Sequence, residues 1–565
     1  MLRPVSLLAA VLLCSAAAAP AFAQNVSRDE VRPSVEEKSL YGAFLAGREA
    51  MTSGDSRGAA AFLIRAADAR PDDKLLRERA FAAALVSGDV TAAARFAPNA
   101  ETASLPMQGL GRLTLAAEAL AAGRGAEADK VLAEKPIGFP HHAASLLLKP
   151  WAAAAAGDWE RAVAAHDAEG DRLVGILDQY TRAQLLESRK RWDEAETLYK
   201  ALIADPVAAS LFWLPYGEFL ERRGREADAV AVYDSALASY RDEAVIAAKA
   251  RAERKGRPPA AATVKSGAAQ TLIYAAASMQ AQRQNELALV YARLALRLDP
   301  AQDQGWVIVG DALSTAKDEP QAREAWARVP ASSRLWADAQ TRTAYSLSRS
   351  GQVEAGVAAL RQVLKTRPDD ASVQLALADL LRTARQYPEA GQVLDALVGG
   401  PGANDWRVLY MRAATREKLG RWPEAEADLK RALELSPEEP ELLNYLGYAW
   451  IDRGQNVTEG LALVERAVAA RPNSGAMQDS LGWAQFRLGK YDKAVELLEA
   501  AVALEPADAS VNDHLGDAYW MSGRQDEARF QWRRVLTLQP DAGLKTAVDA
   551  KLKDGLGPRA QVAGQ

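Results

Sequence analysis

The stretch from Gly475 to Pro506, GAMQDSLGWAQFRLGKYDKAVELLEAAVALEP, decides the fold that the sequence predicts. Two helices are expected in it, the first ending at Gly489 and the second running from Asp492 to the residues before Pro506. Gly489 suits a helix end because glycine adopts the left-handed conformation there without a steric cost. Pro506 suits the end of the second helix because proline cannot continue it. The stretch therefore predicts a helix, a tight turn and a second helix.

Small residues stand where these two helices have to touch, Gly482 on the first and Ala494 and Ala501 on the second. Tyr491 and Leu498 supply bulk beside them. Because small residues let two backbones approach closely, a larger side chain there is expected to cost about 1–3 kcal/mol through overpacking. This spacing resembles the tetratricopeptide (TPR) repeat, whose period is about 34 residues.

The rest of the chain repeats this pattern, and prolines 437, 472, 506 and 540 follow one another at intervals of 35, 34 and 34 residues. One helix pair is too small to bury its own apolar faces, so neighbouring pairs must stack. The resemblance implies an all-α TPR solenoid, a right-handed superhelix of antiparallel helix pairs with about fourteen repeats and a C-terminal capping helix. The structural repeat positions assigned in this way are Gly447, Gly482, Ala494, Ala501, Pro506, Gly516 and Ala528.

The match to the repeat pattern divides the chain. It is loose in the N-terminal half, close in the C-terminal half, and interrupted between the two halves. The break contains Pro258-Pro259, which cannot continue a helix, and it is expected to be a hinge or subdomain boundary. The expected segments are a signal peptide at 1–23, a loose leader at 24–39, a divergent TPR array at 40–255, a Pro/Gly-rich junction at 256–268, a second TPR array at 269–540, and a capping helix and tail at 541–565.

The first segment reads as a cleavable secretory signal peptide. Arg3 precedes an apolar run from Leu7 to Ala19, and Ala21-Phe22-Ala23 gives an A-x-A cleavage pattern. Cleavage after Ala23 predicts a periplasmic or secreted protein without a thiol. The alternative is a lipoprotein attached through Cys14, but the large Leu13 before it argues against lipid attachment.

The composition argues against several classes of protein. The net charge is −5, and charged residues make up 25% of the 565-residue chain. This acidic balance argues against a basic nucleic-acid binder and against a polybasic membrane surface. After the first segment no run of about 18 uncharged apolar residues follows. We therefore expect protein partners, no nucleic acid, and membrane association only through lipidation or through a partner.

The sequence offers few residues for catalysis, and we expect no enzyme activity, metal or cofactor. For His141-His142, in a loop, a solvated loop and a metal site are alternatives. His514 is expected to be packed or hydrogen-bonded rather than a base. The motifs G-x-S-x-G, P-loop and H-E-x-x-H are absent. The basic cluster from Lys249 to Arg257 fits cations at a helix C-terminus, the alternative being a landing site for an acidic partner.

In TPR proteins the first helices of successive repeats line a concave groove that binds peptides or helices of partners. The aromatic residues that the resemblance places on this wall are candidates for binding, because aromatics are common anchors at interfaces. The alternative is packing between adjacent first helices. Carried over residue by residue, the groove candidates are Arg407, Tyr410, Asn444, Tyr448, Asp479, Trp483, Phe486, Arg487, Asp517 and Trp520.

The C-terminal third carries a closer resemblance. LNYLGYAWIDRGQN (443–456), DSLGW (479–483) and NDHLGDAYWMSGRQDEARFQWRR (512–534) are similar to bacterial envelope TPR proteins. One branch of these comprises adaptors that bring cell-wall hydrolases to periplasmic carboxyl-terminal processing proteases. The resemblance implies a non-catalytic scaffold or adaptor that delivers envelope or cell-wall hydrolase substrates to such a protease. The alternative is a structural component of an envelope export or polysaccharide secretion machine.

Overall fold

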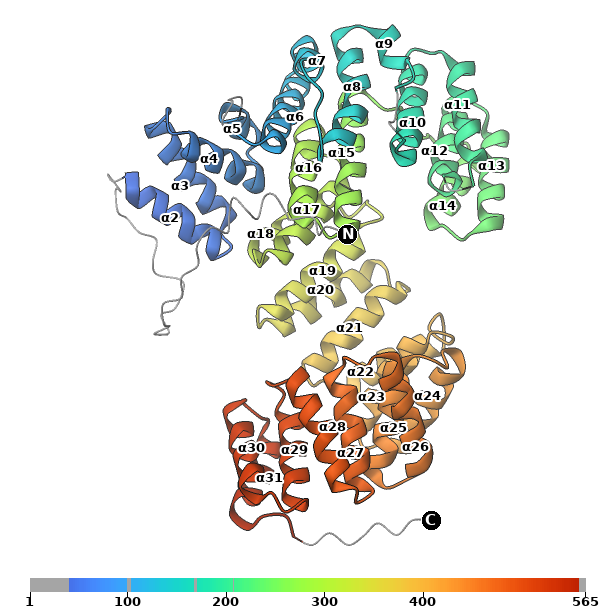
Figure 1. The fold of residues 1–565 in the computed structure, drawn as a ribbon. Coiled ribbons are helices and arrows are strands. Elements are labelled where there is room, and N and C mark those ends of the chain that lie inside the picture. Colours follow the sequence, from blue (N-terminus) through green and yellow to red (C-terminus); the bar gives the residue numbers. More distant parts are fainter. Residues whose placement is uncertain (1–39, 99–102, 167–169, 207, 558–565) are drawn as a thin grey trace. The chain divides into compact units, whose positions relative to one another are not determined.

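The computed structural model describes residues 40–98, 103–166, 170–206 and 208–557 (Figure 1). The predicted signal peptide and leader lie outside these residues. The chain divides into two compact units, which we call unit 1 (residues 1–350) and unit 2 (residues 351–565). Each unit is described by itself.

Unit 1 contains eighteen helices in its described residues. They are α2 (Leu40–Thr52), α3 (Ser56–Ala69), α4 (Lys74–Ser87), α5 (Val90–Arg95), α6 (Leu105–Ala121), α7 (Gly125–Ala133), α8 (His142–Ala156), α9 (Trp159–Val163), α10 (Arg172–Ser188), α11 (Trp192–Ala204), α12 (Ala209–Arg222), α13 (Glu226–Ser239), α14 (Glu243–Glu253), α15 (Val264–Ala281), α16 (Asn285–Leu298), α17 (Asp303–Thr315), α18 (Glu319–Trp326) and α19 (Trp336–Arg349).

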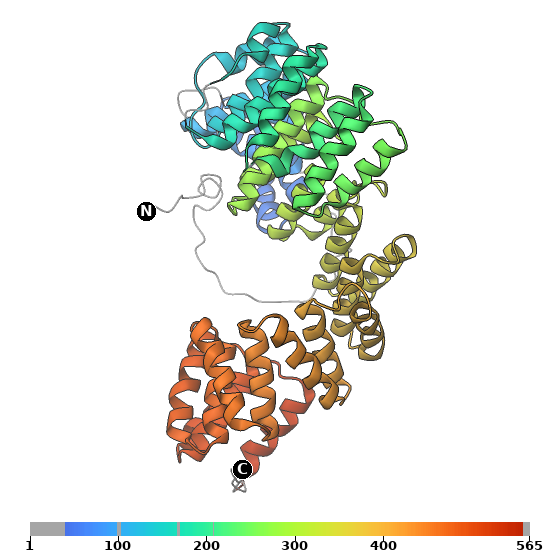
Figure 2. The same ribbon diagram turned by 90° about the vertical axis from the view of Figure 1, so that its right-hand side faces the viewer.

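Unit 2 contains twelve helices in its described residues, and Figure 2 shows them (gold to red) following one another in chain order. They are α20 (Val353–Thr366), α21 (Ala371–Thr383), α22 (Tyr387–Val398), α23 (Trp406–Lys418), α24 (Trp422–Leu435), α25 (Pro440–Arg453), α26 (Val457–Ala470), α27 (Gly475–Arg487), α28 (Tyr491–Leu504), α29 (Ala509–Met521), α30 (Gln525–Thr537) and α31 (Ala542–Asp554).

The described residues contain helices and no strand, so the predicted all-α fold is confirmed. Within the two units the helices make thirteen pairs in chain order, with α14, α19, α20 and α31 left over. The second helix of a pair packs against the first, as α27 and α28 do. This agrees with the predicted TPR solenoid of about fourteen repeats and with a last helix that follows them.

Close approach at small residues holds the pairs together. A Cβ added to Gly482 of α27 would lie 2.6 Å from Leu498 Cγ of α28, and one added to Gly447 would lie 2.6 Å from the carbonyl oxygen of Gly460. Neither position has room for a side chain. Gly489 has a φ of +74°, the left-handed conformation that favours glycine, and ends the first helix.

The other assigned repeat positions lie at the same kind of contact. Ala494, Ala501 and Ala528 are fully buried. A Cβ on Gly516 would lie 2.5 Å from the indole nitrogen of Trp532. Pro506 differs from these positions, because it is exposed and lies two residues after the end of α28, where its carbonyl oxygen accepts a hydrogen bond of 2.8 Å from Arg534.

Unit 1 departs from simple stacking in chain order. The chain leaves α14 through Pro258-Pro259 and enters α15, which packs on α8 and α10. A Cβ on Gly267 of α15 would lie 2.1 Å from the Trp151 ring of α8, and Trp151 Nε1 donates to Thr271 Oγ1 at 3.0 Å. Only glycine lets the two helices come this close. Helices α10–α14 therefore form a side branch of unit 1 (Figure 1).

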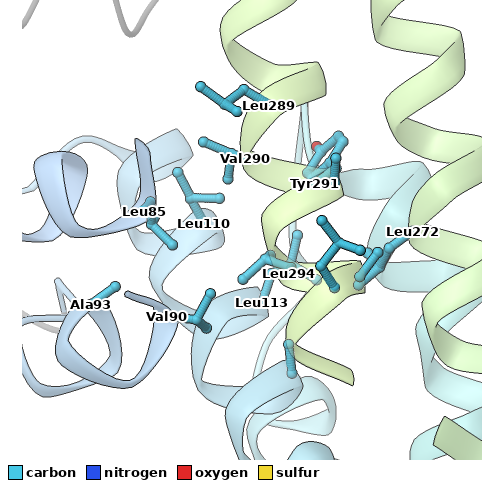
Figure 3. Close-up of a cluster of buried hydrophobic side chains, with 14 of the residues drawn as sticks. Leu85, Val90, Ala93, Leu110, Leu113, Leu272, Leu289, Val290, Tyr291 and Leu294 are labelled. Carbon is cyan, nitrogen blue, oxygen red and sulfur yellow. The ribbon is translucent and has the colours of Figure 1, made fainter. Parts of the chain in front are cut away.

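The next helix, α16, fills the place beside α6 and α4. Figure 3 shows leucines of α6, Leu110 and Leu113, facing Leu289 and Leu294 of α16 in one buried cluster. The predicted junction at 256–268 thus lies inside unit 1, at the crossing from the side branch to this cluster. The division between the compact units falls later, between Ser350 and Gly351.

A polar junction joins the start of α3 to α18. The Asp318 Oδ2 atom accepts hydrogen bonds from the backbone N–H and the hydroxyl of Ser56, at 3.3 and 2.9 Å. Gln321 Nε2 donates to the Ser56 hydroxyl at 2.7 Å, and Arg57 pairs with Glu324 at 2.5 Å. Helices 262 residues apart in sequence are thereby held together.

We predict that Ala494→Trp lowers the free energy of unfolding of unit 2 by at least about 1–3 kcal/mol, because Ala494 is fully buried between α27 and α28 and an indole overpacks that contact. Chemical denaturation of the full chain measures it. Ala503→Trp places the same side chain on an exposed position of α28 and is the control. Equal stability of the two variants would contradict the contact.

Candidate protein-binding face

The predicted groove residues lie on the first helices of successive pairs in unit 2, and α27 packs against both α25 and α29. We call this row of residues the α23–α29 face. It comprises Arg407 and Tyr410 on α23, Asn444 and Tyr448 on α25, Asp479, Trp483, Phe486 and Arg487 on α27, and Asp517 and Trp520 on α29.

The centre of the face is buried within the chain. The Trp483 indole stacks on Phe486, with ring centroids 4.7 Å apart, and on the His514 imidazole, with centroids 4.2 Å apart. Its Nε1 donates to Asp452 Oδ1 at 3.2 Å. Trp483 is 5% exposed and Phe486 is 3% exposed. These two rings join neighbouring first helices and leave little area for a partner.

His514 is held by charge as well as by stacking, as a packed and hydrogen-bonded histidine. Its Nδ1 lies 3.0 Å from both carboxylate oxygens of Asp479. Burial lowers the pKa of His514, but Asp479 and, at longer range, Asp513 and Asp517 raise it by more. The pKa of the imidazole is therefore above its usual value.

The chain's own last helix covers the α29 end of the face. Lys551 Nζ of α31 donates to both carboxylate oxygens of Asp513, at 2.7 and 2.8 Å, and lies 2.7 Å from Asp517 Oδ1. Trp520 Nε1 donates to the Leu556 carbonyl at 3.1 Å. Gly555, with φ +71°, lies flat against the same indole. Asp517 and Trp520 thus secure the capping helix that the sequence predicts.

The accessible part of the face is its α23–α25 end. The Arg407 side chain is 65% exposed, and Tyr410, Asn444 and Tyr448 are partly exposed. The rings of Tyr410 and Tyr445 meet edge to face, 5.4 Å apart. Asn444 and Tyr448 lie one turn apart, on the same side of α25. The Oδ1 atom of Asn444 is itself buried, and it has no hydrogen-bond partner among the described residues.

Comparison with known families decides the nature of these helix pairs. The tetratricopeptide repeat family matches residues 180–244, 341–405, 410–475 and 480–542. The chain contains tetratricopeptide repeats. Such repeats typically form non-catalytic scaffolds for protein interactions, and the chain has that architecture.

A TPR repeat-containing protein of Pseudomonas aeruginosa is 32% identical over 178 residues, which are 31% of this chain and 29% of that protein. The chain thus spans less than a third of this relative's length. Two solved structures resemble this chain at low sequence identity. The Cut9–Hcn1 hetero-tetramer of the APC/C is 14% identical, covers 92% of this chain and 96% of that one, and has a TM-score of 0.39. MamA from Desulfovibrio magneticus RS-1 is 22% identical, covers 30% of this chain and 96% of that one, and has a TM-score of 0.27.

Adjacent TPR first helices are linked by polar contacts that the sequence analysis did not assign. Arg487 donates to the Asp452 carbonyl at 2.5 Å, and His514 pairs with Asp479; both pairs are 35 residues apart. Arg453 pairs with Glu417 at 2.5 Å, 36 residues apart. Opposite charges spaced by about one repeat were the signal that would have found them, because the TPR period is about 34 residues.

Other candidate sites have different outcomes. His141 is 2% exposed and its Nδ1 lies 2.7 Å from the Tyr291 hydroxyl, so the expectation of a solvated loop is wrong for this residue. Within the described residues no group of three or more His, Cys, Asp or Glu side chains is placed to hold a metal. In the basic cluster, Lys249 pairs with Asp234 at 2.5 Å and Arg251 with Glu221 at 2.7 Å.

None of the described helices, α2–α31, combines the length and apolar character that crossing a bilayer requires.

We predict a pH-dependent effect of His514→Gln. Because the pKa of His514 is raised in the folded chain, the charged imidazole stabilises the fold below the pKa of an unfolded histidine, about 6.5. That stabilisation is lost as the pH rises through the folded pKa. The groups around His514 are Asp479, Asp513, Asp517, Trp483 and Tyr448, and Lys551 pairs with Asp513 and Asp517.

The variant should therefore lower the free energy of unfolding more at about pH 6 than at about pH 9. Chemical denaturation of the wild-type protein and the variant at each pH gives the difference between their free energies of unfolding. Titrations that both proteins share cancel in this difference. A loss of the same size at both pH values would show that stacking on Trp483, and not the ion pair, is the whole contribution of His514.

Proposed function

We propose that this protein is a non-catalytic scaffold of the cell envelope that holds a segment of a partner protein on the α23–α25 end of the α23–α29 face. The observation that carries the proposal is the patch of Tyr410, Asn444 and Tyr448, three partly exposed side chains on the first helices α23 and α25, next to the exposed Arg407. Aromatic anchors beside a partly exposed amide suit a partner that supplies apolar surface and hydrogen-bonding groups.

The chemistry around this patch indicates an extended peptide. Arg407 adds an exposed cation, and its side chain lies 3.8 Å from Asp405. The Tyr445 hydroxyl donates to Glu417, so the patch is supported from beneath by a neighbouring first helix. A rigid support lowers the entropic cost of ordering the side chains of the patch when a partner binds. The face at α27 and α29 acts as this support and does not itself contact the partner.

The envelope location and the partner class are proposed from the sequence. The predicted cleavage after Ala23 supports a periplasmic or secreted protein, and Leu13 argues against attachment through Cys14. The resemblance of the C-terminal third to envelope TPR adaptors supports a cell-wall hydrolase or a processing protease as partner. In this role the scaffold brings the two together and performs no reaction itself.

We predict that Asn444→Ala combined with Tyr448→Ala lowers partner affinity by about tenfold or more, since interface aromatics that act as anchors contribute at least about 1–2 kcal/mol each. The measurement is capture of partners from an envelope extract on the immobilised full chain, followed by titration of the captured protein. Phe530→Ala on α30 removes a 64% exposed ring outside the face and is the control.

The captured protein also tests the proposed partner class. A protease or a cell-wall hydrolase that is retained by the control and lost from the double variant supports the proposal. A secretion pore or a polysaccharide synthase in its place would overturn delivery to a protease and support the alternative role in export. Retention of the partner by a correctly folded double variant would overturn the assigned patch.

A further inference from the structure

Unit 1 contains an apolar cavity of 580 Å³ that no sequence pattern indicated. Helix α4 contributes Ala82, Ala83 and Val86 to its wall, and α6 contributes Met107 and Leu110. The wall is completed by the loop that precedes α8, the turn between α15 and α16, and the helices α2, α3, α16 and α17. Leu110 of α6 and Leu289 of α16, both labelled in Figure 3, belong to the cavity wall and to the buried cluster.

The cavity follows from the departure from chain-order stacking. Because α16 packs beside α6 and α4, and Asp318 joins α18 to the start of α3, helices from both ends of unit 1 surround one space. Small side chains line it, including Ala59 and Ala312 as well as the alanines of α4. Native interiors hold few voids larger than a water molecule. A volume of 580 Å³ lies in the range of small-molecule sites, about 300–1,000 Å³.

The polar groups deep in the wall already have partners. Asp318 accepts hydrogen bonds from Ser56 and Gln321. The His141 imidazole bonds to the Tyr291 hydroxyl, and burial lowers the pKa of His141 to about 4, so the ring is neutral. Hydrogen bonds therefore engage Asp318 and His141, the remaining deep wall is formed by apolar side chains, and the interior suits an apolar chain.

One rim of the cavity is polar. The turn from α15 to α16 lines it with Gln282, Arg283, Gln284, Asn285 and Glu286. Arg283 is exposed, with φ +59°, and the first turn of α16, where backbone N–H groups have no partner within the helix, begins at the same rim. A cation beside a helix N-terminus favours a carboxylate. Glu286 lies on the same turn and is exposed, and desolvation raises its pKa.

The other rim is apolar and open. The Phe139 side chain lines it and is 75% exposed, and Leu105, next to the lining residue Pro106, is 82% exposed. Exposed large apolar side chains at the mouth of an apolar cavity are typical of a ligand entrance.

We propose that this cavity binds one molecule of a long-chain fatty acid, with the hydrocarbon chain between α4, α6 and α17 and the carboxylate at the Arg283 turn. The proposal concerns unit 1 and is independent of the peptide patch on unit 2. The volume suits a single chain, and the cation and helix N-terminus at one end suit its carboxylate.

The full chain is titrated with 11-(dansylamino)undecanoic acid, whose fluorescence rises in an apolar site, and the probe is then displaced with oleic acid. We expect one probe per chain and displacement by oleic acid below its micelle concentration. Methyl oleate, which lacks the carboxylate, should compete at least about tenfold more weakly, the factor that corresponds to 1.4 kcal/mol. Equal competition by methyl oleate, or displacement only by micelles or by phospholipid vesicles, would overturn the proposal.

Two variants on one helix locate the site. Ala83→Leu puts a larger side chain into the cavity and so fills part of it. The change should abolish probe binding while leaving thermal stability unchanged or higher. Ala80→Leu makes the same change at a fully buried position of α4 outside the cavity wall, and should lower stability and keep binding. Phe139→Ser, on the exposed rim, should lower the affinity for the probe without destabilising the fold. Normal binding by a folded Ala83→Leu protein would place the ligand elsewhere and overturn the proposal.

Discussion

The close approach of two helix backbones at a glycine or an alanine is the constraint on which this structure depends. Each helix pair has two apolar sides and too little surface to bury both, so its stability comes from the pairs before and after it. That requirement fixes where small residues stand, as at Gly482 against Leu498 and at Gly447 against Gly460. Where one helix carries glycine, a larger side chain of its partner fills the contact, as Leu498 does opposite Gly482 and Trp532 opposite Gly516.

The same constraint explains how unit 1 leaves the simple serial order. Gly267 is the one residue of α15 that lets that helix lie on the Trp151 ring of α8, and the hydrogen bond from Trp151 to Thr271 fixes the crossing. Helix α16 then takes the place beside α6 that the next pair would otherwise occupy. The alanine-lined cavity is a consequence, because this arrangement surrounds a space that small side chains do not fill.

Local pattern was enough to predict the helices, their pairing and the left-handed glycine turns, because each depends on residues within one repeat. Gly489 and the helix bounds around it are examples. The return of α15 to α8 was not predicted, since it rests on a contact between Trp151 and Thr271, 120 residues apart, that leaves no periodic mark. His141 was misassigned for the same reason, because its partner Tyr291 is 150 residues away.

The candidate face shows why spacing alone does not separate packing from binding. Trp483 and Tyr448 occupy equivalent places on successive first helices, and the sequence treats them alike. What distinguishes them is the residue 31 positions further on, in the next repeat: His514 stacks on Trp483 at 4.2 Å, whereas the equivalent residue beyond Tyr448 is Asp479, which has no ring. A solenoid whose first helices are tied by ion pairs one repeat apart can bury aromatic residues at one end of a face and leave them accessible at the other. The binding surface is therefore set by where the polar ties cover the rings, and this is a property of pairs of repeats that no single repeat contains.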